Sequence, residues 1–106
     1  MDKPIEISDY FQNGRRKIIS VKANDDFTLS LLFDNNETRI FDMKENLKGN
    51  AFRHFREMSE FERVYVDGNG CIAWDIDPKI DSNKIWNNKV DLCPDSCYIY
   101  SVQSEH

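Results

Sequence analysis

Hydrophobic and polar residues alternate most regularly between residues 27 and 33. Every second residue from Phe27 to Phe33 is apolar, and a period of two is typical of a strand that buries one face. A β-branched stretch at 17–23 precedes this segment and the stretch 37–42 follows it, with turns rich in Asn and Asp between them. The pattern therefore predicts a three-stranded antiparallel meander.

The pattern changes after the meander. Residues 42–49 are typical of one short helical turn that ends at Gly49. Asn50 follows at a position suited to capping a second helix, on which Phe52 and Phe55 would face the core. We therefore expect two short helices in the middle of the chain.

A second hairpin is expected after these helices. Residues 64–67 and 71–75 are apolar stretches separated by the sequence Gly-Asn-Gly, which is typical of a hairpin turn. Residues 75–91 are polar and irregular, and we interpret them as a long loop insertion, which in a compact domain is usually functional or mobile. Pro94 fits the first position of a terminal helix.

These elements together predict an α+β fold. It consists of an antiparallel sheet of two hairpin or meander units, with short helices on one side and a C-terminal helix. Residues 1–16 are expected to form an N-terminal arm. Residues 17–106 are expected to form a single domain that carries the 75–91 insertion.

The charge of the chain limits the classes of partner that we expect it to bind. Its 106 residues include 14 Lys and Arg against 19 Asp and Glu, a net charge of −5, and only three basic but seven acidic residues follow residue 66. Nucleic-acid affinity depends largely on Lys and Arg contacts to phosphate, and the sole basic cluster in the sequence is Arg15-Arg16-Lys17. We therefore expect no direct binding of nucleic acid.

The sequence also indicates a cytoplasmic address. No apolar run reaches the roughly 20 residues that span a bilayer. The first residues lack the basic and then apolar segments of a signal peptide. We therefore expect a cytoplasmic protein that does not contact a membrane.

Three cysteines, Cys71, Cys93 and Cys97, are the first candidates for chemistry. Structural zinc sites usually take four ligands at paired short spacings, and the only histidines that could complete such a set are His54 and His106. An odd number of cysteines argues against a disulfide framework. We interpret them as free structural thiols, with a metal site or a redox site as the alternatives, and expect no cofactor.

Five carboxylates, Asp75, Asp77, Asp81, Asp91 and Asp95, lie in or just after the insertion. They raise the alternative of a small metal-dependent or hydrolytic enzyme. A calcium loop that began at the first of them would need Gly at its sixth position and Glu at its twelfth, and both are absent. A solvated acidic face is the simpler interpretation, so we assign no catalytic residue and no metal ligand.

Trp86 is the largest apolar residue of the insertion. Ordering about fifteen loop residues costs on the order of 1–2 kcal/mol each, so the loop needs an apolar anchor. We predict that Trp86 packs onto the sheet or the terminal helix and leaves Asn87 and Asn88 near the rim of an interaction surface. The candidate interaction surface consists of Trp86, Asn87, Asn88, Asp91 and Asp95.

Several stretches in order resemble a bacterial family known as domain of unknown function 2442. They are residues 19–35, 39–42, 61–67 and 72–75, and the ending Asp91-Leu92-Cys93-Pro94-Asp95. The resemblance extends over residues 17–100, although shorter members reach the ending without the long insertion. It implies a small α+β domain, sometimes fused to a helix-turn-helix, whose gene often neighbours that of another small protein. It implies no activity and no catalytic residues.

Three classes of function remain open at this point, one as the leading hypothesis and two as alternatives. The leading hypothesis is a non-enzymatic protein-binding module, an antitoxin-like partner of a small basic protein from an adjacent gene. Its basis is the acidic charge of the chain and the lack of a catalytic signature. The alternatives are the small enzyme described above and a regulator linked to transcription indirectly, through a partner. A homo-oligomer is compatible with each.

Overall fold

The computed structural model describes residues 16–103 as two antiparallel sheets with short helical segments. The first sheet has the strand order β1-β2-β3-β7 and the second has the order β4-β5-β6. The strands are β1 (Ile18–Ala23), β2 (Thr28–Phe33), β3 (Thr38–Asp42), β4 (Tyr65–Val66), β5 (Ile72–Asp75), β6 (Lys89–Leu92) and β7 (Val102–Gln103). The α+β fold predicted from the sequence is thus confirmed, while the predicted arm at 1–16 lies almost wholly outside the described residues.

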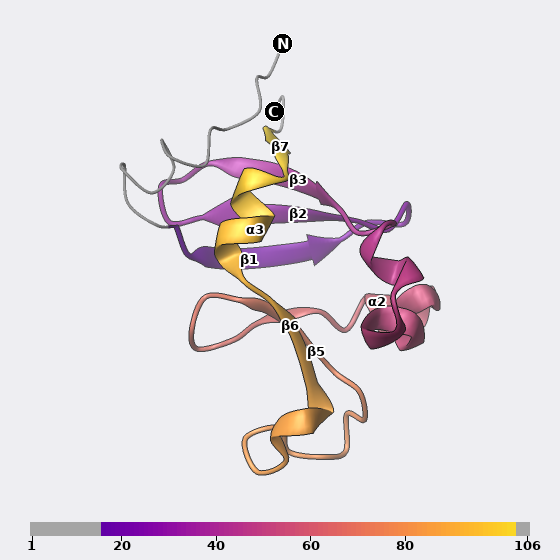
Figure 1. Ribbon diagram of the computed structural model, residues 1–106. Helices are drawn as coiled ribbons and strands as arrows, with labels where there is room; N and C mark the ends of the chain where they lie inside the picture. Colours follow the sequence, from indigo (N-terminus) through magenta and orange to yellow (C-terminus); the bar gives the residue numbers. More distant parts are fainter. Residues whose placement is uncertain (1–15, 104–106) are drawn as a thin grey trace.

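The meander forms where the alternating pattern predicts it (Figure 1). Leu29, Leu31 and Phe33 on β2 are fully buried, while Ser30 and Leu32 on the opposite face are only partly buried. The register of β1 against β2 shifts between Ile18 and Ser20, which leaves Ile19 exposed at an irregularity of the edge strand. The short C-terminal strand β7 extends this sheet beside β3.

The helical region between the two sheets contains mostly 3₁₀ helix. It consists of η1 (Asn46–Lys48), η2 (Asn50–Arg56) and the α-helix α2 (Met58–Phe61). The predicted end of the first turn at Gly49 is confirmed, but the predicted cap is wrong. Gly49 itself precedes η2, and Asn50 lies inside the helix and makes no side-chain capping bond. Burial of Phe52 and Phe55, rather than a cap, holds this segment in place.

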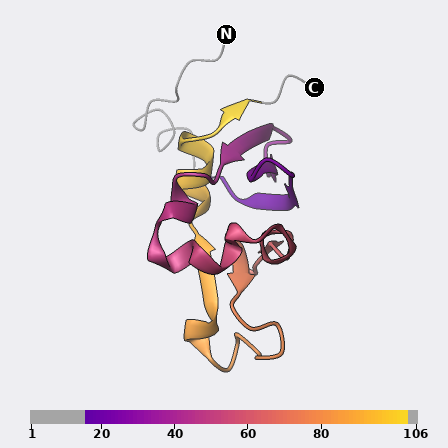
Figure 2. The ribbon, with the colours of Figure 1, turned by 90° about the vertical axis from the view of Figure 1, so that its right-hand side faces the viewer.

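The second sheet differs most from the sequence expectation. The hairpin of β4 and β5 is confirmed, but β5 also pairs with β6, which lies at the end of the segment predicted as a loop. The insertion is therefore shorter than expected, since it runs only from 76 to 88 between two paired strands. In Figures 1 and 2 it lies at the end of the molecule that is remote from the meander.

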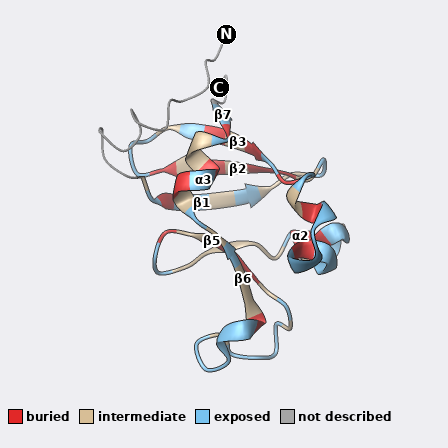
Figure 3. Ribbon diagram, in the orientation of Figure 1, coloured by how far each residue is buried: buried red, intermediate tan, exposed pale blue. Residues whose placement is uncertain are grey.

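Aromatic side chains join the second sheet to the helical region. Buried segments occur in both of these regions (Figure 3). The Trp74 side chain is completely buried, and its ring lies 5.4 Å from that of Phe55 and 6.0 Å from that of Phe61, between centroids. Its indole Nε1 donates a hydrogen bond of 2.9 Å to the backbone oxygen of Phe61. The one polar atom of this large side chain is thus satisfied inside the core.

The terminal helix α3 (Pro94–Ile99) packs against the meander. Its Tyr98 ring meets Phe33 edge to face at 4.9 Å. The buried guanidinium of Arg39 on β3 donates to Ser101 at Oγ, 2.6 Å, and at the backbone oxygen, 2.8 Å. These contacts fix the end of the chain, so that β6 and α3 connect the two sheets.

Candidate functional site

The loop 76–88 displays an unusual number of apolar side chains. Ile76, Ile80, Ile85 and Trp86 are all exposed, and Trp86 is the most exposed of them at 83%. The prediction that Trp86 anchors the loop is therefore wrong. Exposed apolar residues that gather on one segment mark an interaction surface more often than isolated ones do.

Asn88 has the anchoring role that was predicted for Trp86. Its side chain is 6% exposed, and its Oδ1 accepts a hydrogen bond of 2.9 Å from the backbone N–H of Asp77. Its Nδ2 lies within hydrogen-bonding distance of the backbone oxygens of Asp77 and Ile80 and of Ser82 Oγ. A loop is rich in backbone polar groups that must be paired when they are buried, and one buried amide pairs several of them here.

Asp75 at the end of β5 adds a second polar support to the loop. Its Oδ1 accepts hydrogen bonds from Ser82 Oγ at 2.6 Å and from the hydroxyl of Tyr65 at 2.8 Å. Burial, and next the hydrogen bond to Asp75, raise the pKa of Tyr65 above its ordinary value. Because the hydroxyls of Tyr65 and Ser82 both donate to this one carboxylate, Asp75 ties the loop to β4.

A groove of about 750 Å³ opens between this loop and the turn that joins β4 to β5. Its walls include Tyr65, Asp67, Asp75 and Lys89, together with the loop residues 78–83. The groove is lined mainly by polar groups. A polar ligand in this groove would meet carboxylate, ammonium and hydroxyl groups.

The strands of the second sheet alternate, and this explains how the groove acquires its charges. Ile72 and Trp74 on β5 point into the core, so the positions between them and beside them face the other way. On that outer face Asp67 lies opposite Cys71, and Asp75 lies opposite Lys89. The outer face therefore carries charged groups around Ala73, which is itself fully buried, while the inner face is apolar.

Lys89 and Asp67 form the central ion pair of this face, with Nζ and Oδ2 3.0 Å apart. Burial opposes the charge on Asp67, but the hydrogen bonds from Lys89 and from the backbone N–H groups of Cys71 and Asn69 hold its pKa below the ordinary value. The bond to Asp67 in turn raises the pKa of Lys89. The pair thus links β6 to the hairpin turn.

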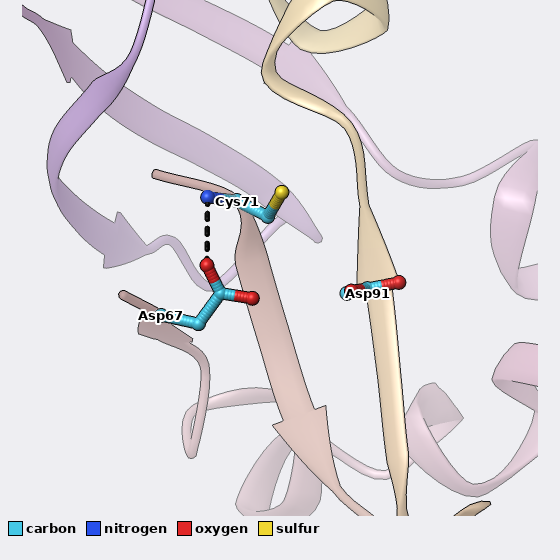
Figure 4. A group of neighbouring side chains, drawn as sticks. All are labelled: Asp67, Cys71 and Asp91. Carbon is cyan, nitrogen blue, oxygen red and sulfur yellow. Dashed lines mark hydrogen bonds between the residues drawn. The ribbon is translucent and has the colours of Figure 1, made fainter. Parts of the chain in front are cut away.

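Asp67, Cys71 and Asp91 are close enough to hold a metal ion, since their ligand atoms lie within 4.8 Å of one another (Figure 4). The group already has a cation from the protein. Lys89 Nζ lies 3.0 Å from Asp67 Oδ2 and 3.9 Å from Asp91 Oδ2. A metal ion would have to displace this ammonium group, so the arrangement favours a self-contained ion-pair network.

The structure separates the residues of the predicted interaction surface. Trp86 and Asn87 are exposed on the loop, in the 3₁₀ helix η3 (Trp86–Asn88), while Asn88 lies buried beneath them. Asp91 is exposed on the outer face of β6. Asp95 is buried in α3, where it lines a hollow with Cys71 and Cys93 and not the loop.

The residues that sequence reasoning missed are Tyr65, Ser82 and Lys89. Each belongs to the groove or to the hydrogen bonds that shape it. The alternation of residues 89–92, polar then apolar twice over, is the one signal that could have revealed the third strand of this sheet.

The protein is a small α+β domain whose second sheet carries an exposed loop. The family model described as protein of unknown function (DUF2442) matches residues 18–101, so the chain belongs to the DUF2442 family. Comparison with curated proteins and with solved structures found no match. Among the described residues, no helix is both long and apolar enough to cross a membrane.

Proposed function

We propose that the protein is a non-enzymatic protein-binding module whose loop 76–88 docks a small basic partner in an antitoxin-like manner. The observation that carries this proposal is the exposure of Trp86, at 83%, on a loop that buried hydrogen bonds hold in place. A tryptophan that the fold does not need for packing is free to bury its surface against another protein.

The loop has the features of a binding hot spot. Tryptophan is among the residues most enriched at hot spots, where a few central side chains supply most of the binding energy. Ile85 lies beside Trp86 and is 49% exposed, so the two side chains offer adjacent apolar area. Because Asn88 and Asp75 already order the loop, a partner would not have to supply the free energy of ordering it.

The net charge of the whole chain, and not the charge of the loop, favours a basic partner. The loop carries Asp77 and Asp81 but also Lys79 and Lys84, so its own charges balance. The net charge of −5 belongs to the rest of the protein. Such a long-range field speeds the encounter with a cationic partner, while the apolar contacts determine how long the complex lasts.

The test is co-expression with the small basic protein expected from the adjacent gene, followed by gel filtration and titration calorimetry. We expect a complex whose Kd rises at least tenfold in Trp86→Ala, with an unchanged melting temperature. Tyr100→Ala is the matched control, because Tyr100 is also an exposed aromatic residue, at 70%, but lies at the end of α3. It should leave the affinity unaltered.

Two results would contradict the proposal. One is independent elution of both proteins at micromolar concentration. The other is equal affinity of the wild type and Trp86→Ala for the partner. Gel filtration of the chain alone distinguishes a further case, since dimerisation that Trp86→Ala abolishes would identify a second copy of the chain as the occupant of the loop.

A further inference from the structure

The three cysteines lie near the ends of β5 and β6 and in the first turn of α3. Cys71 directly precedes β5, and Cys93 directly follows β6 at the start of α3. Cys97 lies one helical turn later, and its N–H donates to the backbone oxygen of Cys93 at 3.3 Å. All three are free thiols.

The register of the second sheet places two of them opposite one another. Ile72 pairs with Leu92, and the antiparallel register is regular along all of β5 and β6. One further step along each strand brings Cys71 opposite Cys93. The backbone of Cys93 is extended, with φ −62° and ψ 138°, so the strand continues to this residue without a break.

The hydrogen bonds show which kind of cross-strand pair this is. The N–H of Ile76 donates to the oxygen of Asn88 at 2.7 Å, which makes the odd-numbered residues of β5 the non-hydrogen-bonded positions toward β6. Cys71 agrees, because its N–H and its C=O both bond to Asp67 on the opposite side. In such pairs the Cα atoms lie about 4.5 Å apart, which is within the range that a disulfide requires.

Exposure distinguishes these two thiols from the third. Cys93 is exposed and Cys71 is half-buried, and both line one open hollow of about 350 Å³ together with Arg16 and Lys17. Cys97 is fully buried, and burial raises the pKa of its thiol to about 12. Burial, and next the charge of Asp67, raise the pKa of Cys71 as well. Cys93 is therefore the thiol that an external reagent meets first.

The geometry points to Cys71 and Cys93 as a reversible cross-strand disulfide pair that is oxidised by exchange with a low-molecular-weight disulfide. The thiolate of Cys93 attacks one sulfur of the reagent and releases one thiolate. Cys71 then loses its proton to solvent and attacks the Cys93 sulfur, which releases the second thiolate. Two protein thiols become one disulfide, and the reagent is reduced to two thiols.

This bond would close a ring at the base of the displayed loop. The ring runs from Cys71 through β5, the loop 76–88 and β6 to Cys93. Closing it restricts the unfolded chain and so stabilises the second sheet. The inference stands on the strand register and does not depend on the proposed function of the loop.

The experiment treats the full chain with oxidised glutathione and maps the product by mass spectrometry. A protease that cleaves before Asp separates Cys93 from Cys97, because Asp95 lies between them. We expect peptide 67–74 linked to peptide 91–94, an intact mass lower by two hydrogen atoms, and a melting temperature higher by several degrees. Dithiothreitol should reverse all three changes.

Three single variants test the order of the steps. Cys71→Ser should accumulate glutathione on Cys93. Cys93→Ser should take up no glutathione and form no disulfide. Cys97→Ala should still form the disulfide between Cys71 and Cys93. If replacing this buried residue prevents folding, the peptide map of the wild type still shows whether Cys97 takes part. A link between Cys93 and Cys97, a wild type that stops at the glutathione adduct, or an intermolecular dimer would overturn the inference.

Discussion

The meander and the second sheet bury their apolar residues by different means. In the meander, strands of five and six residues pair along their length, and a continuous row of side chains on β2 fills the core. The second sheet has strands of two and four residues, and it depends on Trp74 for its packing and on Asn88 for the shape of its loop. The meander therefore packs through a regular row of side chains, whereas the second sheet packs through one large aromatic residue and carries an exposed loop.

The two tryptophans, Trp74 on β5 and Trp86 on the loop, show how the packed part of the second sheet differs from its exposed loop, and Trp74→Ala should produce the largest effect. Trp74 is completely buried and Trp86 is 83% exposed. We expect Trp74→Ala to lower the free energy of unfolding by about 3–5 kcal/mol, since it empties a large aromatic site and also leaves the Phe61 carbonyl without its donor. Trp86→Ala should change it by less than about 0.5 kcal/mol.

Urea unfolding followed by far-ultraviolet circular dichroism measures both variants on one scale. The emission spectrum gives an independent check, because Trp86 should be quenched by acrylamide while Trp74 is protected. A loss of several kcal/mol in both variants would show that the loop is part of the core. The contrast between the packed second sheet and its exposed loop would then not hold.

The sequence was most informative where the packing is regular. The alternation from Phe27 to Phe33 predicts β2 and its neighbours, because a strand with one buried face must repeat every two residues. Strands β6 and β7 were missed for a physical reason. Each is so short that its period barely repeats, and β6 presents Lys89 and Asp91 to the solvent, so that only two apolar residues remain to mark it.

The candidate site was predicted only in part. Sequence reasoning chose the insertion as the surface and Trp86 as its main residue, which agrees with the exposed loop, but it assigned the anchoring role to the largest apolar side chain. Apolar area is visible in a sequence. The hydrogen-bond network of Asn88 is not, because it depends on backbone groups that only the folded loop brings together.

Asn88→Ala is the next largest expected effect and tests whether polar groups hold the loop. The variant removes every hydrogen bond of the buried amide and leaves the backbone N–H of Asp77 without its partner, while the Asp77 carbonyl still accepts from the N–H of Ile80. A buried donor or acceptor that is left without a hydrogen-bond partner lowers the free energy of unfolding by about 1–3 kcal/mol. Hydrogen exchange of the amides between 77 and 82 should accelerate, while the amides of β2 should exchange as in the wild type.

Asn87→Ala is the matched control, since Asn87 is the same residue type next in the chain but is exposed. It should leave both stability and exchange unchanged. If Asn88→Ala exchanged no faster than this control, the loop would owe its order to something other than the buried amide.

The smallest effect concerns the ion pair of Asp67 and Lys89, and it sharpens the comparison because it is confined to the second sheet. The folded-state pKa of Asp67 is lowered from its ordinary value of 3.8. Its contribution to stability is therefore present above pH 4 or so and is lost as the pH falls through the lowered value. The pKa of Lys89 is raised from 10.5, so its contribution is present below that pH and is lost as the pH rises through the raised value.

Asp67→Asn should remove the contribution of this ion pair to the pH dependence of stability at both ends of this window. The asparagine retains an oxygen that accepts from the backbone N–H of Cys71, so the variant removes the charge and keeps the turn. Because Lys89 remains partly exposed, we expect a loss of no more than about 1 kcal/mol near neutral pH. Urea unfolding from pH 3 to pH 11 measures the free energy of unfolding of both proteins. Asp91→Asn is the control, because Asp91 lies farther from the ammonium group of Lys89, at 3.9 Å, and is half-exposed. Equal pH profiles for the wild type and Asp67→Asn would show that the pair contributes nothing to the second sheet.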